Sequence, residues 1–200
     1  MWSGILVVAL FGQALAEGVK PAAALHVGAT VPFTPLSSNA TVRLEAGAFL
    51  PMVGERIAPI VMGAYSAPVF NGEATDERLG DAYTVNVRQK ELMIGIGATV
   101  RLFEADRRVN PELTVAPQLQ FLETVATGTS AGGAIGTTRE RYAKLGFLVA
   151  AGVGIGLGPG TLTIQVGYAG TGLDGVLTGK STTGAFNPTV GYRVTLPLGS

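Results

Sequence analysis

The 200-residue sequence contains no cysteine and only one histidine. The absence of cysteine excludes disulfide bonds, thiol catalysis, cysteine-ligated metals and a lipid-modified N-terminal cysteine. Charged residues are also scarce, at 14% of the chain, whereas soluble domains contain about 25%. Acidic and basic residues balance at 14 each. The charge therefore gives no reason to expect nucleic acid as a partner.

Long hydrophobic runs are missing as well. Apolar residues make up 47% of the chain, yet none of its segments reaches the run of roughly 20 apolar residues that a membrane-spanning helix needs. A closed β-barrel is the other structure that can cross a bilayer, because its strands satisfy one another's backbone groups. The 29 glycines also favour strands and turns, since each glycine in a helix costs about 1 kcal/mol relative to alanine.

The N-terminus has the features of an export signal. Residues Ile5 to Phe11 form a short apolar core, and Ala14-Leu15-Ala16 is an A-x-A cleavage pattern. We expect a cleavable signal peptide at 1–16 and a single barrel domain at 17–200. The alternative is that this segment forms a buried N-terminal helix or strand.

The segment from Leu145 to Leu157 is the strongest structural signal in the chain. Its odd-numbered positions are all apolar, and its even-numbered positions are mostly glycine or alanine. Alternate side chains of a strand point to opposite faces. The pattern predicts a long strand with one face against lipid and the other against a narrow lumen.

Similar alternation recurs along the chain. It predicts eight strands, at roughly 22–32, 40–50, 56–66, 83–103, 111–125, 140–157, 161–169 and 184–197. The alternation is weak in the third strand. Pro117 interrupts the fifth, and we expect a bulge or a weak pairing there, because proline lacks the N–H that a ladder hydrogen bond requires.

The connections between these strands alternate strictly in length. Those at 33–39, 67–82, 126–138 and 170–183 are polar or rich in Gly, Ser, Thr and Pro, and most are long. Those at 51–55, 104–110 and 158–160 are shorter. Short periplasmic turns and longer external loops are typical of up-and-down barrels in outer membranes. Aromatic residues near strand ends, among them Phe33, Phe49 and Phe186, fit a pair of interfacial girdles.

On these features the sequence resembles the small eight-stranded outer-membrane β-barrel proteins of the OmpA/OmpX type, over about residues 20–198. The last strand, Thr189-x-Gly191-x-x-Val194-x-Leu196, is similar to the C-terminal signal that the barrel-insertion machinery recognises in that family. Its members usually end at an aromatic residue, whereas this chain continues through residues 197–200. The resemblance implies an antiparallel up-and-down transmembrane barrel in the outer membrane of a Gram-negative bacterium. It implies little about activity, because this architecture serves adhesins, enzymes and structural proteins.

The polar rows of the predicted strands contain charged residues of both signs. Buried charges persist only when they are paired and hydrogen-bonded. We therefore predict a lumen plugged by salt bridges, with a proton or ion path as the alternative. The predicted lumen residues are Arg43, Glu45, Glu91, Arg101, Glu112, Glu140, Lys144 and Arg193.

Nothing in the sequence supports catalysis, a cofactor or a metal site. His26 lies on a polar strand face without a sequence-adjacent serine or aspartate. The glycines from Gly152 to Gly158 alternate within a strand, whereas a dinucleotide-binding loop has its glycines in a strand-to-helix turn.

We expect a monomeric barrel with a structural or surface-interaction role. Its expected partners are outer-membrane lipid, the insertion machinery and an extracellular ligand of the loops. The alternatives are a barrel enzyme that acts on lipid or peptide through His26, and a soluble lipocalin-like barrel with an apolar interior.

Overall fold

The computed structural model describes residues 19–75, 82–130, 132–175 and 179–196. The predicted signal peptide at 1–16 lies outside the described residues, as does part of the predicted loop at 67–82. In the described part of the chain, no helix is both long and apolar enough to cross a membrane.

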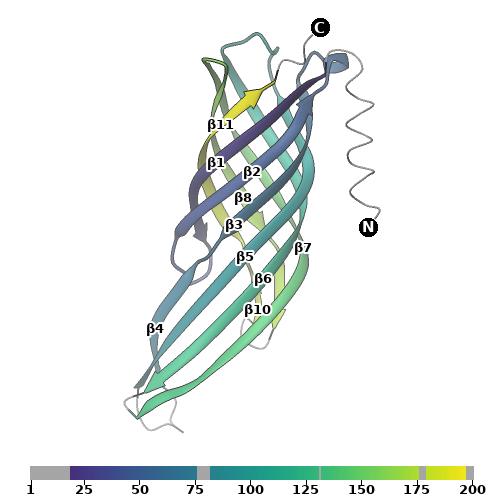
Figure 1. Cartoon of the computed structure of the whole chain (residues 1–200). Helices are drawn as coiled ribbons and strands as arrows, with labels where there is room; N and C mark the ends of the chain where they lie inside the picture. The colour runs from purple at the N-terminus through teal and green to yellow at the C-terminus, as the bar shows by residue number, and fades with distance from the viewer. Residues whose placement is uncertain (1–18, 76–81, 131, 176–178, 197–200) are drawn as a thin grey trace.

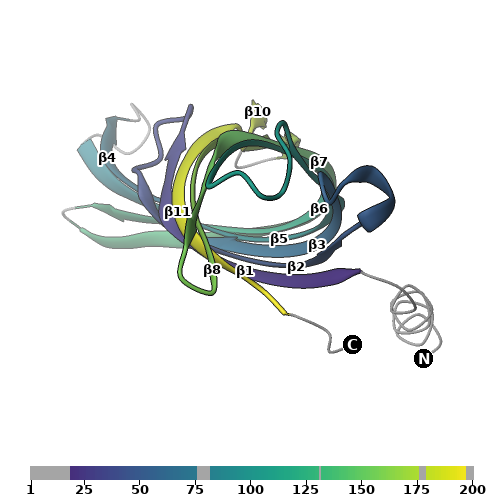
Figure 2. The same ribbon diagram turned by 90° about the horizontal axis from the view of Figure 1, so that it is seen from above.

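Eight antiparallel strands form a closed ring (Figures 1 and 2). Seven consecutive pairings run in the order β3-β2-β1-β11-β8-β7-β6-β5, and an eighth pairing between β3 and β5 closes the ring. The strands are β1 (Lys20–Pro32), β2 (Asn39–Phe49), β3 (Ile57–Ser66), β5 (Ala82–Arg101), β6 (Val109–Ser130), β7 (Gly133–Leu157), β8 (Gly160–Gly170) and β11 (Ala185–Thr195). The predicted up-and-down barrel is therefore confirmed, with each of the eight predicted strands in place.

The short connections lie at one end of the barrel, which we call the turn end. They link β2 to β3, β5 to β6 and β7 to β8, and the first contains a single 3-10 turn, η1 (Pro51–Val53). The described chain also begins and ends at this rim (Figure 1). The predicted alternation of short and long connections is wrong, because β6 ends at Ser130 and β7 begins at Gly133, a shorter connection than the one between β5 and β6.

At the opposite end, much of what the sequence suggested as loop is sheet. β4 (Val69–Thr75) continues the line of β3 and pairs with β5, so the predicted loop at 67–82 is wrong over β4. The predicted loop at 126–138 is also wrong, because β6 extends to Ser130 and β7 begins at Gly133. The segment 170–183 contains a small hairpin of β9 (Gly172–Gly175) and β10 (Gly179–Thr182). Of the four, only 33–39 is largely a loop, since β2 begins at Asn39.

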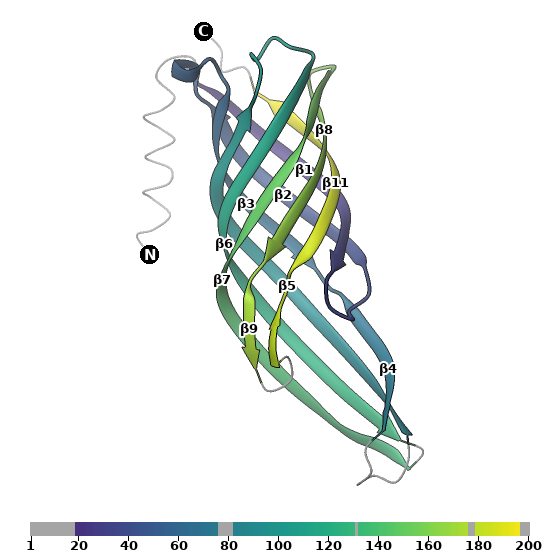
Figure 3. The same cartoon turned by 180° about the vertical axis from the view of Figure 1, so that it is seen from behind.

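These strands build a sheet that projects beyond the ring, which we call the extension. It consists of β4 together with the parts of β5, β6 and β7 at 82–90, 123–130 and 133–141. The hairpin of β9 and β10 stands apart from it on another part of the rim (Figure 3). The barrel thus has one flush rim and one rim that rises steeply on one side.

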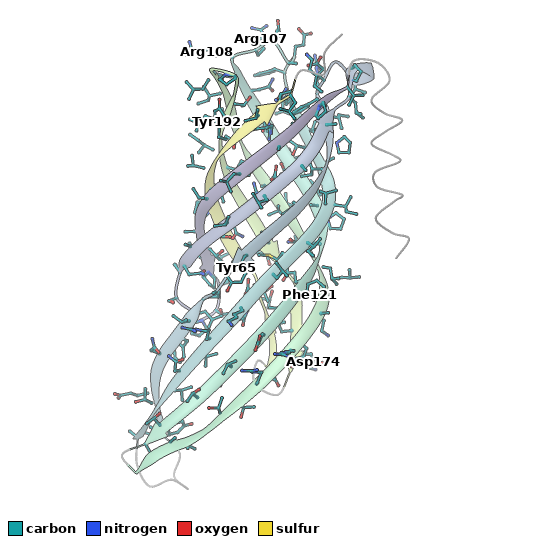
Figure 4. The ribbon with its side chains drawn as sticks, in the orientation of Figure 1. Tyr65, Arg107, Arg108, Phe121, Asp174 and Tyr192 are labelled. Carbon is teal, nitrogen blue, oxygen red and sulfur yellow. The ribbon has the colours of Figure 1, made fainter. Side chains whose placement is uncertain are left out.

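The ring turns its apolar rows outward and its polar rows inward. Ile96 is 68% exposed and Leu145 82% exposed, whereas Arg43 and Arg193 are each 4% exposed. Tyr65 and Phe121 point away from the barrel wall (Figure 4). The predicted sidedness is confirmed, and the lipocalin-like alternative, which needs the apolar rows inside, is wrong.

Three strand prolines each interrupt one ladder of the ring. Pro117 pairs with Phe147 on one side, but on the other side the β5–β6 register breaks between Gly95 and Ala98. The predicted weak pairing at Pro117 is therefore confirmed. Pro188 pairs with β8 and lies at a gap in the ladder between β1 and β11. Pro59 pairs with β5 and lies just beyond the end of the ladder between β2 and β3.

A glycine lies against a backbone carbonyl at each of these three places. A Cβ atom on Gly28 would come within 2.0 Å of the Pro188 carbonyl oxygen. The corresponding distance is 2.4 Å from Gly47 to the carbonyl of Pro59. Gly97 lies in the same gap as Pro117, where its Cβ would be 2.1 Å from the Val115 carbonyl. At these places the two backbones approach too closely for any side chain.

We predict that Gly97→Ala destabilises the barrel by about 1–3 kcal/mol, because the added methyl group overlaps backbone that cannot move aside. Gly63→Ala is the matched control, since the nearest atom to a Cβ there is 3.9 Å away. The measurement is the urea midpoint at which the compact band disappears on a gel run without boiling. Equal midpoints for the two variants would contradict the close approach.

Candidate functional site

The lumen near the turn end is organised around Glu112. Arg193 donates to it from both guanidinium nitrogens, with distances of 2.7 Å to Oε1 and 2.9 Å to Oε2. The Nε of Arg101 donates to the same carboxylate at 3.2 Å. Glu112 and Arg193 are 3% and 4% exposed, so one buried carboxylate holds two cations contributed by β5 and β11.

Phe49 contributes an aromatic ring to the cluster around Glu112. Its ring lies under both guanidinium groups, with centroid distances of 3.7 Å to Cζ of Arg101 and 5.6 Å to Cζ of Arg193. A cation over an aromatic face is attracted by the ring quadrupole. The predicted place of Phe49 in an interfacial girdle is wrong, because the side chain is inside the barrel. Its position on the polar row of β2 was the signal that could have located it there.

A second cluster contains Arg43, Glu45 and the only histidine. The Arg43 Nε lies 2.8 Å from Glu45 Oε1, and Arg43 also donates to the Gln165 side-chain oxygen. The His26 Nε2 lies 3.4 Å from Glu45 Oε2, and its Nδ1 lies 3.4 Å from the Thr163 hydroxyl. His26 is completely buried. The surroundings of this histidine are those of a packed interior residue, in contact with Glu45 and Thr163.

Glu91 lies in different surroundings. Its carboxylate accepts hydrogen bonds from the Ser66 hydroxyl at 2.9 Å and from the Gln89 amide at 2.5 Å. Both donors are neutral, although Glu91 is 5% exposed. The structure thus places five of the predicted lumen residues in two ion-pair clusters and Glu91 in a third, uncharged setting. Glu140 and Lys144 lie on the inward row of β7 and are half-buried.

The lumen between its two mouths is packed. Three interior cavities have volumes of about 10, 20 and 10 Å³. A cavity needs about 10–15 Å³ to hold one water molecule. An apolar layer formed by Met62, Leu148 and three alanines fills part of this interior. A cavity of about 250 Å³ lies at the turn end, where Arg107 and Arg108 contribute to its rim (Figure 4).

The described residues do not assemble a metal centre. Among them, no group of three or more His, Asp or Glu side chains is arranged to hold an ion. The charged clusters are instead self-contained, because each carboxylate of the two ion-pair clusters faces cations of the chain itself. Chemically, the lumen is suited to fixing the strands in register rather than to binding a small molecule at its centre.

No protein-family model and no curated protein matches the sequence. Among solved structures, the N-terminal β-barrel domain of OprF from Pseudomonas aeruginosa matches with a TM-score of 0.48 and 8% identity, over 90% of this chain and 100% of that one. The chain itself folds as a closed ring of eight antiparallel strands.

A second match is Ail, the attachment invasion locus protein of Yersinia pestis, solved in complex with the heparin analogue sucrose octasulfate. It has a TM-score of 0.42 and 14% identity, and the match covers 88% of this chain and 97% of Ail. At these identities the likeness concerns the fold alone.

We predict that Glu112→Gln lowers the free energy of unfolding by about 3–5 kcal/mol, because it removes the nearest counter-charge from the buried guanidinium of Arg193 and the half-buried one of Arg101. Glu123→Gln is the control. Glu123 also pairs with two arginines, Arg139 and Arg141, but these are 57% and 68% exposed. An exposed pair contributes about 0–1 kcal/mol. Urea titration of both variants in the same detergent would reveal the difference, and similar losses would contradict a special role of Glu112.

Proposed function

We propose that the protein is an integral outer-membrane barrel whose extension serves as a surface for interaction outside the cell. The flush turn end then faces the periplasm, and the rim with the extension faces outward. Its partners are outer-membrane lipid around the wall, the insertion machinery during assembly, and an extracellular ligand at the extension. The barrel is expected to work as a monomer.

The band of exposed apolar side chains around the ring carries this proposal. It includes Leu25, Leu44, Ile96, Leu145, Val166 and Val190, which come from six different strands and are each at least 47% exposed. Such a band would aggregate in water, whereas it is the ordinary outer surface of a barrel in lipid. An aromatic cluster of Phe33, Tyr168, Phe186 and Phe147 adjoins it on the outer wall, as expected where acyl chains give way to headgroups.

The outer surface changes character where the extension begins. Along β5, the outward row is Ile96, Ile94 and Leu92, and then Lys90 and Arg88, all of them exposed. Charged side chains on a lipid-facing position are costly. This change supports an external boundary of the membrane between Leu92 and Lys90 on this strand.

The packed lumen supports a structural plug rather than a pore. Two ion-pair clusters and one aromatic ring fill the cross-section of the lumen. Near the turn end these are Arg101, Glu112, Arg193 and Phe49, and further inside Arg43 and Glu45. Charged side chains that are paired this closely with one another do not offer binding sites along a path for a permeating ion. The enzyme alternative gains no support from His26, because its ring is sealed among interior side chains.

We predict that Ile96→Arg destabilises the inserted barrel by about 2–4 kcal/mol, the cost of arginine on a lipid-facing position near the bilayer midplane. Val125→Arg is the matched control, because Val125 lies on the outer face of the extension between Arg88 and Arg139. Outer-membrane fractionation and the shift in gel mobility on boiling measure insertion. A chain that stays in solution without detergent, or equal tolerance of both variants, would refute the membrane assignment.

The outer face of the extension is basic close to the proposed boundary. Arg88 and Arg139 flank Val125, and Lys90 and Arg141 flank Glu123, in the register of β5, β6 and β7. All four cations are exposed. Four cations around a single carboxylate favour an anionic partner, such as a sulfated or phosphorylated saccharide.

We predict that the bilayer-embedded protein binds sucrose octasulfate. The triple variant Arg88→Ser, Arg139→Ser, Arg141→Ser should bind it at least tenfold more weakly. Binding should weaken steeply with salt, because exposed charges are screened. Isothermal titration at two salt concentrations measures both effects. The control is Arg107→Ser with Arg108→Ser at the opposite rim (Figure 4), which should leave the affinity unchanged. Equal losses in the two variants would contradict the proposed site.

A further inference from the structure

The inward row of the extension contains more apolar side chains than the polar rows of the ring below it, although Thr124 and Glu140 also lie on it. In the ring, polar side chains point inward, but on the extension the inward row carries Phe70 of β4, Val85 and Val87 of β5, and Ala126 of β6. The outward row of the same strands is mostly polar or charged, with Val69 and Val125 among its apolar members. Outside the membrane, the outer face of the sheet contacts water and is expected to be polar. Contact with lipid therefore does not explain why the inner face carries apolar side chains.

These inner side chains form one wall of a pocket of about 420 Å³ at the external mouth. Pro35 and Leu36 from the β1–β2 connection line it, as does Leu173 of the β9–β10 hairpin. The pocket is therefore enclosed by three separate segments of the external rim. Its volume is within the range of about 300–1,000 Å³ that is typical of small-molecule sites.

The pocket contains polar groups that await a partner. The hydroxyl oxygens of Thr34 and Thr124 line it and are buried without a hydrogen-bond partner in the structure. Thr124 as a whole is only 3% exposed. A buried hydroxyl without a partner costs about 1–3 kcal/mol, so a ligand that bonds to these groups regains that free energy. Gln89, Ser181 and Thr182 supply further uncharged polar contacts.

The charge of the surroundings selects the ligand's head group. The residues that line the pocket include no lysine, arginine, aspartate or glutamate. The buried carboxylate of Glu91 lies next to the pocket and accepts a hydrogen bond from the side-chain amide of Gln89. Its two hydrogen-bond donors, Gln89 and Ser66, are both neutral. An anionic head group entering here would be repelled by this carboxylate, and no cationic side chain is among the described residues that line the pocket.

We propose that the external mouth binds a single-chain amphiphile, with its hydrocarbon tail against Phe70, Val87 and Leu173 and an uncharged hydroxyl-bearing head bonded to the two threonines. The pocket faces outward only in the orientation proposed above, and to that extent the inference rests on the proposed function. It concerns the inner face of the extension, whereas the anionic site is on the outer face.

The experiment uses the protein in phosphatidylcholine nanodiscs with methyl-labelled valine, leucine, isoleucine and alanine. Monolauroylglycerol is the probe, and laurate is the anionic comparison. Methyl signals of Val87 and Leu173 should shift saturably, while those of Ile96 and Val190 on the lipid face should report only partition into the bilayer. Laurate should bind at least tenfold more weakly above neutral pH.

Two variants test the pocket itself. Ala126→Trp fills it and should abolish the saturable shifts, whereas Val125→Trp adds the same side chain to the outer face and should preserve them. Leu36→Ser is the second pocket variant, and because Leu36 lies outside the strands it guards against a folding defect in the first. It should weaken binding at least fivefold in a barrel that still shifts on boiling.

The outcomes separate the two proposals. Failure to enter nanodiscs as a heat-modifiable barrel refutes the membrane assignment. A correctly inserted barrel whose pocket methyls do not shift, or shift without saturation in parallel with the lipid-facing methyls, refutes the amphiphile site alone. Stronger binding of laurate than of its glyceryl ester refutes the uncharged head group.

Discussion

Closure of the sheet by β3 and β5 is the constraint on which the rest of the molecule depends. The ten residue pairs from Ile57 with Val100 to Ser66 with Glu91 turn an open sheet into a ring. An open sheet would leave two rows of unpaired backbone groups in the acyl layer, where each costs several kcal/mol. Closure removes both edges, and it also creates an interior only just wide enough for side chains. The narrow interior then dictates what each inward position can be.

That interior explains both the pairing of charges and the positions without side chains. Glu112 can hold two guanidinium groups because Gly154 on the opposing strand leaves space, and a Cβ there would lie 2.9 Å from the carboxylate. Gly191 similarly makes space for the ring of His26, at 2.5 Å from its Nδ1. Small and large side chains alternate across the lumen as a packed core requires, although many of the large ones are polar.

The number, order and sidedness of the ring strands could be predicted from the sequence because period-two alternation with an apolar outer row is a local property. The extension could be predicted only in part, because residues 83–90 belong to the predicted fourth strand, whereas β4 and the paired segment at 126–138 were predicted as loops. Its strands alternate as well, in Val85, Val87 and Gln89 for example, but their apolar row faces inward, and their threonines and glycines are as frequent in loops. The partners within the lumen also escaped prediction. The ion pair between Arg193 and Glu112 depends on the register of β11 relative to β6, and β7 and β8 lie between these two strands in the ring. Strand register cannot be read directly from a single sequence.

The three longest strands carry a mechanical consequence. β5, β6 and β7 contain 20, 22 and 25 residues, whereas about 9–11 residues suffice to cross a bilayer. Residues 133–141 of β7 lie in the extension, and at about 3.3 Å per residue they continue the wall of the ring by about 3 nm of strand. A partner bound at the tip of the extension is held at the end of this continuous sheet, and a sideways force on it is transmitted through the strand backbones into the ring.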